Sequence, residues 1–267
     1  MKRLSWMVLV FLLVGSSLPV SAQTGNGYSG HHWTISSLEF ATSAPPILMT
    51  VVDSNGRRTG GDPSMPVGIH GQQGAHSNSG FAEIPLSAVD QTNIANDETD
   101  EDQPTTLWEV FILDGGRQTY TVNLFGIVTG EAQIHVSGEN SSRPIHLARN
   151  RFHVLVAQGQ TRQVNVTFDP SSLGLTVQRI IQPQDLGTDV KTACQLNLIS
   201  PGGTRQDLQT KANAISRDAK SHNTQEEIQA IQVFLSALQA AGKNHIQDPA
   251  FTILQEDATA LLKTVRK

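Results

Sequence analysis

Apolar and polar residues alternate with a period of two through most of residues 31–181, which predicts strands in this part of the chain. The clearest segment is Thr119–Gly138. Its apolar positions are Tyr120, Val122 and Leu124 in the first half and Ala132, Ile134 and Val136 in the second. Two such runs joined by the short segment Gly126–Gly130 predict a β-hairpin. A lone hairpin is at most marginally stable in water, so further strands must cover its apolar face.

Other segments predict those strands. Ile47–Val52 precedes Asp53–Gly56, whose Asn-Gly pair suits a tight hairpin turn. Leu107–Leu113 is apolar on both faces, as expected for an interior strand, and Phe152–Phe168 predicts a second hairpin around the turn Gln158–Gln160. Shorter strands are expected at residues 31–40, 82–89 and 175–181. About eight strands at this spacing predict a β-sandwich, mainly antiparallel, at residues 23–200.

After Pro201–Gly203 the apolar spacing changes to that of an α-helix. Three helices are expected: the first starts near Thr204, the second runs from Thr224 to Gly242, and the third starts at Asp248-Pro249. Short loops between them predict a small C-terminal bundle at residues 201–267. We interpret the apolar stripes as its core. The alternatives are a partner-binding face or a membrane-surface face, and the mixed charges on the polar faces argue against the membrane.

The strand-rich part contains short motifs in a fixed order. Pro46–Pro63 joins an apolar strand to an aspartate, a Gly-Arg-Arg turn and Gly-x-Asp-Pro, and Ile84-Pro85 and Gly116–Gly130 follow. This order resembles a pattern of secreted bacterial β-sandwich modules, although Ala132-Gln133 stands where that pattern has an aromatic residue. The resemblance implies a non-catalytic extracellular module and supplies no site residues.

The helical part contains a second set of motifs: Leu196–Ile199, Phe234–Leu238, Gly242–Ile246 and Leu261-Leu262. Their order resembles the FIMAH domain, a helical module found towards the C-terminus of secreted bacterial proteins, commonly after β-sandwich domains. The resemblance covers nearly the whole tail. It implies a three-helix FIMAH-like domain at residues 201–267 and assigns no activity to it.

The first 22 residues have the pattern of a secretory signal peptide. Lys2 and Arg3 precede the apolar run Met7–Val14, and small residues allow cleavage after Ala22. The run is shorter than the roughly 20 apolar residues that span a membrane. We therefore expect a secreted or periplasmic chain that is not inserted in a membrane after cleavage.

Charge and cysteine content exclude several classes of protein. Loss of the first 22 residues would shift the formal net charge from -5 to -7, which suits neither nucleic acid nor anionic membranes. The single cysteine, Cys194, excludes an internal disulfide framework and a thiol-based zinc site. Its apolar neighbours favour a buried thiol over a reactive one.

Two segments could supply oxygen ligands for calcium. Asp53, Asn55 and Asp62 form the first set, but Arg57-Arg58 places positive charge beside them and no glutamate completes the series, so we interpret them as turn residues. The second is Asp97–Asp102, which holds five carboxylates. A solvated loop is the favoured interpretation there, and calcium is the alternative.

The histidines give no firm metal site and no firm catalytic one. His31 and His32 are adjacent, so on a strand their rings would point to opposite faces. His70 and His76 lie in a long loop without a third ligand at fixed spacing. His135 belongs, with Gln133 and Ser137, to a run of polar outward positions that we interpret as a solvated face. We expect no cofactor and assign no catalytic, cofactor-binding or metal residues.

No serine-hydrolase elbow, zinc-protease motif, phosphate loop or dinucleotide fingerprint is found in the sequence. We expect a secreted, non-catalytic interaction or accessory protein that binds an extracellular surface, polymer or partner protein. The alternative is a small extracellular hydrolase or carbohydrate-binding protein that uses loop carboxylates, with His135, His153 and Asp97–Asp102 as the groups to test. A purely structural module is the third possibility.

Overall fold

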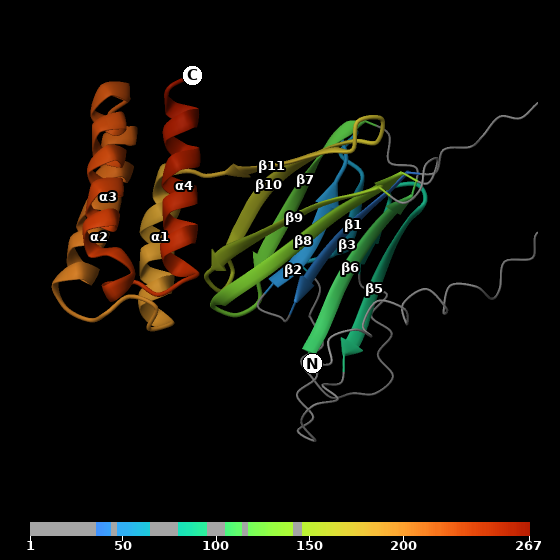
Figure 1. Ribbon diagram of the computed structural model, residues 1–267, viewed down its shortest axis with the longest axis horizontal. Helices are drawn as coiled ribbons and strands as arrows, with labels where there is room; N and C mark the ends of the chain where they lie inside the picture. Colours follow the sequence, from blue (N-terminus) through green and yellow to red (C-terminus); the bar gives the residue numbers. More distant parts are fainter. Residues whose placement is uncertain (1–35, 44–46, 65–79, 95–104, 114–116, 141–145) are drawn as a thin grey trace, which may run out of the picture. The chain divides into compact units, whose positions relative to one another are not determined.

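The strands pair only in antiparallel fashion in the part of the chain that the structure describes, and they form two separate sheets (Figure 1). The structure is a computed structural model that describes residues 36–43, 47–64, 80–94, 105–113, 117–140 and 146–267. These residues all belong to one compact unit, Thr34–Lys267. Eleven strands and four helices lie within them. Mainly antiparallel sheets followed by helices are therefore confirmed.

Each sheet is open, with two edge strands. The first has the order β5 (Ser87–Ile94), β6 (Thr105–Leu113), β1 (Ser36–Ser43), β8 (Gly130–Asn140) and β9 (His146–Val156). The second has the order β11 (Gly174–Ile180), β10 (Thr161–Asp169), β7 (Gln118–Gly126), β2 (Ile47–Val52), β3 (Arg58–Gly61) and β4 (Gly80–Ala82). We call them the five-stranded and the six-stranded sheet.

One hydrophobic cluster contains residues of both sheets. The five-stranded sheet contributes Val110, Ile112, Ala132, Ile134, Val136, Phe152 and Val154, and the six-stranded sheet contributes Ile47, Met49, Val51, Tyr120, Val122, Leu124, Val164, Val166 and Phe168. These are the alternating apolar positions of the sequence. Period-two alternation therefore identified the buried face of these strands correctly, because successive side chains of a strand point to opposite faces.

The two long hairpins expected from the sequence are wrong. Thr119–Gly138 divides between the sheets: β7 pairs with β2 and β10, whereas β8 pairs with β1 and β9. Phe152–Phe168 divides in the same way between β9 and β10. The expected turns at Gly126–Gly130 and Gln158–Gln160 are crossings from one sheet to the other. Alternation fixes which face a strand buries, but it does not fix the partner strand.

The two crossings hydrogen-bond to each other. Gly126 N donates to Gln160 O at 2.8 Å, and Gly159 N donates to Gly126 O at 2.8 Å. A Cβ added at Gly126 would lie 2.2 Å from the carbonyl oxygen of Ala157. Glycine is thus required at position 126 by the close approach of two chain segments, and a hairpin turn is not the reason.

Other strand predictions fare differently. The hairpin through Asp53–Gly56 is confirmed, because β2 pairs with β3 and Gly56 adopts a φ of 78°. The strand expected at residues 82–89 is interrupted: β4 ends at Ala82, a turn follows, and β5 starts at Ser87. In the strand expected at 31–40, β1 occupies residues 36 onwards, and residues 31–35 lie outside the described part.

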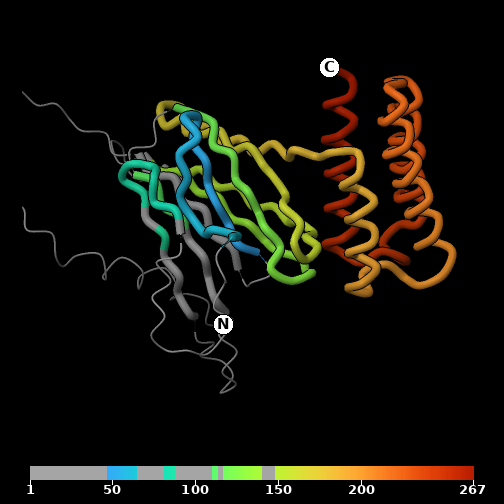
Figure 2. Tube along the Cα trace, turned by 180° about the vertical axis from the view of Figure 1, so that it is seen from behind, coloured from blue at the N-terminus to red at the C-terminus, as the bar shows by residue number. Residues whose placement is uncertain are grey.

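The helices are α1 (Pro183–Gln195), α2 (Gly203–Lys220), α3 (Thr224–His245) and α4 (Ala250–Val265). Figure 2 shows the chain running from β11 into α1 and then through the other three helices. The three expected helices correspond to α2, α3 and α4. Gly242 interrupts the helical backbone with a φ of 56°, near the expected end of the second helix. Helix α3 starts at the expected residue, Thr224, and Asn223 caps it by accepting a hydrogen bond from Glu226 N.

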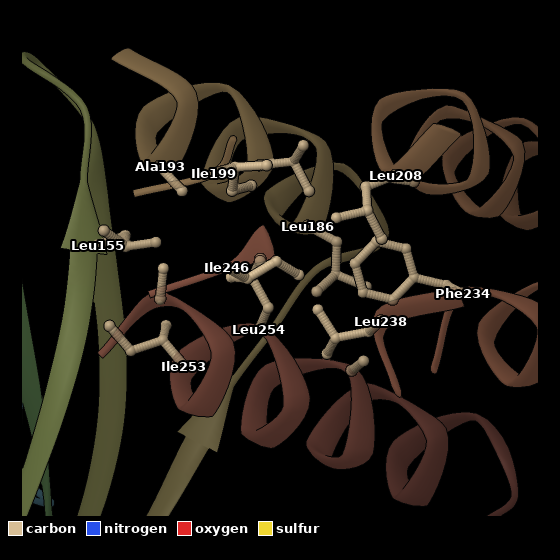
Figure 3. Packing of buried hydrophobic residues seen from close by; sticks show 14 of the residues in the cluster. Leu155, Leu186, Ala193, Ile199, Leu208, Phe234, Leu238, Ile246, Ile253 and Leu254 are labelled. Carbon is tan, nitrogen blue, oxygen red and sulfur yellow. The ribbon is translucent and has the colours of Figure 1, made fainter. Parts of the chain in front are cut away.

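Helix α1 was not expected from the sequence. It lies within residues 23–200, which were assigned to strands, and its start carries ordinary helix signals. Pro183 occupies the first turn, and Gln182 N donates to Asp185 Oδ2 at 2.8 Å in a capping box. Buried residues of α1 join those of the other helices in a second hydrophobic cluster around Phe234 and Leu238 (Figure 3). The helical part thus contains four helices and starts at residue 183.

Strands and helices meet through this second cluster. Leu155 of β9 and Ile181, which follows β11, are buried in it together with residues of α1 and α4 such as Ala193 and Ile253. Figure 3 shows the Leu155 side chain beside Ala193 and Ile253. Two ion pairs also join the strands to these helices: Arg162 of β10 pairs with Asp189 of α1, and Arg179 of β11 pairs with Asp257 of α4.

Candidate functional site

Neighbouring polar side chains lie on the outer face of the five-stranded sheet. In β8 the buried residues Ala132, Ile134 and Val136 alternate with partly exposed ones. The antiparallel register places His153 of β9 directly opposite Gln133. We define the polar row as Glu131, Gln133 and His135 of β8 and His153 of β9.

Hydrogen bonds connect the whole polar row. His153 Nδ1 lies 2.5 Å from Glu131 Oε1, and His153 Nε2 lies 2.9 Å from Gln133 Nε2. Gln133 Oε1 lies 2.9 Å from His135 Nε2. Because the Gln133 amide donates through its nitrogen and accepts through its oxygen, His135 donates to it from Nε2 and His153 accepts from it at Nε2. The tautomer of each ring is thereby fixed.

Charge within the polar row is confined to one end. Burial lowers the pKa of His135, and the electrostatic interaction with the nearby Arg151 lowers it further. His135 therefore stays neutral at neutral pH. Glu131 is the only carboxylate of the row, and His153 contacts it directly. The row offers an imidazole, an amide and a carboxylate, a mixture suited to a polar ligand with both donors and acceptors.

The polar row has a clear boundary at each end. Arg151 lies opposite His135, Arg149 lies opposite Ser137, and both arginines are exposed. At the other end Leu155 lies opposite Glu131 and is buried against the helices. From Glu131 to His135 a strand advances about 13 Å. The row is therefore a short linear surface that starts where the helices stop covering the sheet.

The geometry does not resemble a catalytic triad. The rings of His135 and His153 make their hydrogen bonds to Gln133 and Glu131. An amide and a carboxylate do not act as the hydroxyl or thiol nucleophile that a triad requires. Glu131 could orient His153 as a general base. In the structure, however, Nε2 of His153 already accepts a hydrogen bond from the Gln133 amide. The four residues of the polar row therefore offer hydrogen-bond donors and acceptors and include no hydroxyl or thiol nucleophile.

Asp53 is a turn residue, as expected. Its carboxylate accepts hydrogen bonds from the backbone N–H groups of Asn55 and Arg57 and from Arg57 Nε at 2.7 Å. Burial raises the pKa of Asp53, but the hydrogen bonds from Arg57 and Asn55 outweigh burial, so the pKa is lowered. Asp62 accepts from Ser64 instead of joining Asp53. The carboxylate of Asp53 is thus committed to Arg57.

Several candidates lie outside the described residues. These are His31, His32, His70, His76 and the acidic run Asp97–Asp102, so calcium binding by that run stays an open alternative. Cys194 is described and buried, and burial raises the pKa of its thiol. Within the described residues no group of three or more histidine, cysteine, aspartate or glutamate side chains could hold a metal ion.

Two hollows of the described part of the chain were considered as ligand sites. An open groove of about 530 Å³ lies between α1 and α2, lined by Lys191, Arg205 and their neighbours. Arg205 Nη2 donates to the carbonyl oxygen of Cys194 at 2.6 Å, so this guanidinium satisfies the C-terminal end of α1. A cavity of about 10 Å³ beside Arg162 and Asp257 is too small for a substrate.

Half of the polar row was predictable from the sequence. Gln133 and His135 were expected as outward residues, but the link through Glu131 and His153 was missed. Their pairing depends on the register between β8 and β9, and that register cannot be derived when the partner strand is assigned wrongly.

No family identifies the chain. The chain matches no protein-family model, and no match is found among curated proteins or among solved structures. In the described part, no helix has both the length and the apolar character needed to cross a bilayer.

Proposed function

We propose that this protein is a secreted, non-catalytic accessory protein that binds a hydroxyl- or amide-rich extracellular polymer through the polar row. The observation that carries the proposal is the continuous hydrogen-bonded connection from Glu131 through His153 and Gln133 to His135. A fixed set of donors and acceptors can bind a polar chain at little ordering cost, because the side chains are already held in place.

The shape and charge of the row favour a polymer over a small substrate. It is a linear surface of about 13 Å on one face of a sheet, whereas enzymes place their reacting groups in a concave, largely apolar pocket. Exposed Arg149 and Arg151 next to the row extend the polar surface along β9. A partner protein would engage the same surface, and the test below distinguishes the two.

The proposal includes the finer assignments made from the sequence. We interpret the two sheets as a β-sandwich, supported by the hydrophobic cluster that they share. We interpret the helical part as a FIMAH-like module, and residues 1–22 as a signal peptide that directs the chain to the periplasm or the medium. These assignments rest on sequence motifs and pattern, and they fit a module that attaches to material outside the cell.

The test uses the purified mature chain, residues 23–267, on an array of soluble polysaccharides and on a bacterial envelope fraction. Gln133→Ala breaks the central link of the polar row, and Gln163→Ala is the matched control. Gln163 is also a glutamine bonded to a neighbouring side chain, Asn123, but it lies on the six-stranded sheet. We expect saturable polymer binding that Gln133→Ala weakens at least tenfold and Gln163→Ala leaves unchanged.

The same preparation is tested for turnover of glycoside, ester and peptide substrates. Turnover that is lost on replacement of His135, His153 or Asp97–Asp102 would support the hydrolase alternative and contradict the proposal. Binding only to a protein component of the envelope fraction would also contradict it, because the ligand class would then be a partner protein.

A further inference from the structure

Six charged side chains meet where the strands contact the helices. Arg162 of β10 pairs with Asp189 and, at 2.8 Å, with Asp185, both of α1. Arg179 of β11 pairs with Asp257 at 2.7 Å and with Glu256 at 2.6 Å, both of α4. Each arginine therefore comes from a strand, and each carboxylate comes from a helix. We call Arg162, Arg179, Asp185, Asp189 and Asp257 the junction cluster.

The junction cluster is almost completely removed from water. Side-chain exposure is 4% for Arg162, 9% for Arg179, 0% for Asp189 and 4% for Asp257. Asp185 is 17% exposed, whereas Glu256 is 50% exposed and reaches solvent. Arg162 Nη2 also donates to the carbonyl oxygen of Asp185, and Arg179 Nη2 donates to that of His153. Charges buried to this degree must be compensated locally.

The charges of the junction cluster do not balance when all groups are ionised. Two arginines face the buried carboxylates of Asp189 and Asp257 and the partly exposed carboxylate of Asp185, which leaves one negative charge in excess. One proton bound to a carboxyl group makes the cluster neutral. Two carboxylates that share a site cannot both ionise easily, so one of them keeps its proton.

Asp189 and Asp257 are the two most buried carboxyl groups of the junction cluster. Asp189 Oδ2 is buried and has no hydrogen-bond partner as long as both groups are carboxylates. The side chain of Asp257 is within hydrogen-bonding reach of Asp189. A proton between them satisfies the orphan oxygen, since a protonated carboxyl group donates where a carboxylate can only accept.

The electrostatic environment favours the same state. Burial raises the pKa of Asp189 well above its ordinary value, and the charges of Asp257 and Asp185 raise it further against the opposing effect of Arg162. Burial also raises the pKa of Asp257, against the lowering effects of Arg179 and Arg162. The two groups titrate as a pair, so the proton belongs to the pair and to neither residue alone.

We propose that Asp189 and Asp257 share a single proton at neutral pH and form a pH-sensitive clasp that holds the helices on the strands, firm in mild acid and weaker in alkali. The groups facing the pair are Arg162 of β10, Arg179 of β11, Asp185 of α1 and Glu256 of α4. When the shared proton leaves, the cluster holds an uncompensated negative charge. The carboxylates of Asp189 and Asp257 must then move apart or be hydrated, and the contact between the helices and the strands opens.

The direction of the pH effect follows from linkage. Both pKa values are raised in the folded state, so the folded protein holds a proton that the unfolded chain, with aspartate pKa values of about 3.9, releases. This stabilisation is complete below about pH 4 and is lost as the pH rises through the raised value. Asp53, Asp169 and Asp248 have lowered pKa values and act in the opposite sense, losing their stabilisation in acid. Maximal stability is therefore expected in mild acid.

The first experiment measures urea unfolding of the mature chain from about pH 5 to pH 9. Release of one proton on unfolding changes the unfolding equilibrium constant by up to about tenfold per pH unit, and we expect wild type to become less stable as the pH rises. Asp189→Asn keeps the shape of the side chain and can donate to Asp257. We expect this variant to lose most of that slope, whereas Asp207→Asn, on the surface of α2, should keep it.

A second experiment needs no variant to fold. A protonated carboxyl group has its own infrared C=O band, which we expect in wild-type protein at pH 7 and expect to disappear as the pH is raised. Hydrogen exchange of residues 183–195, corrected for the intrinsic rate, should accelerate over the same pH range, while exchange in β7 should not. Absence of the band at pH 7, or a wild-type slope that is flat or opposite in sign, would overturn the proposal.

Discussion

The ring of Phe168 on β10 lies against the backbone of Gly138 on β8. A Cβ added at Gly138 would approach the ring carbons to 2.4 Å, closer than real Cβ contacts allow. The two residues belong to different sheets, β8 to the five-stranded and β10 to the six-stranded one. Glycine at 138 is therefore the sequence feature that allows Phe168, the aromatic residue of β10, to be buried completely.

This contact predicts the effect of a single methyl group. Gly138→Ala should destabilise the protein by about 1–3 kcal/mol, because the ring of Phe168 must move in a packed core. Urea unfolding measures the loss. Gly203→Ala is the control, since a Cβ there meets nothing within 4 Å and the φ angle is ordinary.

Replacing Phe168 with leucine in the Gly138→Ala background should recover part of the stability, since the smaller side chain leaves space for the methyl group. Equal effects of Phe168→Leu with and without Gly138→Ala would show that the two residues do not interact and would contradict the contact between the Phe168 ring and Gly138.

The buried faces of β7, β8, β9 and β10 were predictable from the sequence, and their partner strands were not. The buried positions Tyr120, Val122 and Leu124 follow directly from alternation. Their strand nevertheless pairs with β2 and β10 and not with the next strand along the chain. Short glycine-bounded segments serve equally well as hairpin turns and as crossings between sheets, and sequence pattern alone cannot separate the two.

The junction cluster was missed for a different reason, although a signal existed. Arg162 has the same parity as Val164, Val166 and Phe168, so an arginine occupies a position of the apolar face. Asp257 lies between buried Leu254 and Ala258 on α4 in the same way. Charged residues that interrupt an apolar pattern indicate a buried ion pair. Their partners are far apart in the chain, so only the fold brings them together.

Removing one partner of the junction cluster should be costly. Arg162→Ala leaves Asp185 and Asp189 without their guanidinium, and unpaired buried charge typically costs about 3–5 kcal/mol. Arg117→Ala should have almost no effect, because Arg117 is 78% exposed and lies 3.7 Å from Asp169. Thermal and urea unfolding of both variants measure the difference, and similar small losses for the two would show that the cluster does not stabilise the contact.

The core of the helical part predicts a sharp contrast within one helix. Leu238 on α3 is completely buried beside Phe234 (Figure 3), whereas Val233 on the same helix is 46% exposed. Leu238→Asp should cost several kcal/mol, roughly 3 or more, because it buries a charge, and Val233→Asp should change stability by about 0.5 kcal/mol or less. Circular dichroism melting checks both. Equal effects would mean that α3 does not pack through Leu238.

Calcium should not be needed for folding. Asp53, one of the candidate calcium ligands in the sequence, already accepts hydrogen bonds from the Arg57 side chain and from two backbone N–H groups. Melting curves in excess chelator and in millimolar calcium should therefore coincide. A large rise in Tm with calcium that disappears when Asp97–Asp102 is neutralised would assign a calcium site to that run and contradict this prediction.

The most direct test of the binding role is to locate the bound polymer on the protein. The probe is a short oligosaccharide fragment of the polysaccharide that binds most tightly on the array, titrated into isotope-labelled mature chain and followed by NMR. We predict saturable shifts at Glu131–His135 and Arg149–His153, with the imidazole signals of His135 and His153 among the largest. Shifts confined to the groove between α1 and α2, or to the six-stranded sheet, with an unchanged polar row would contradict the proposed binding role.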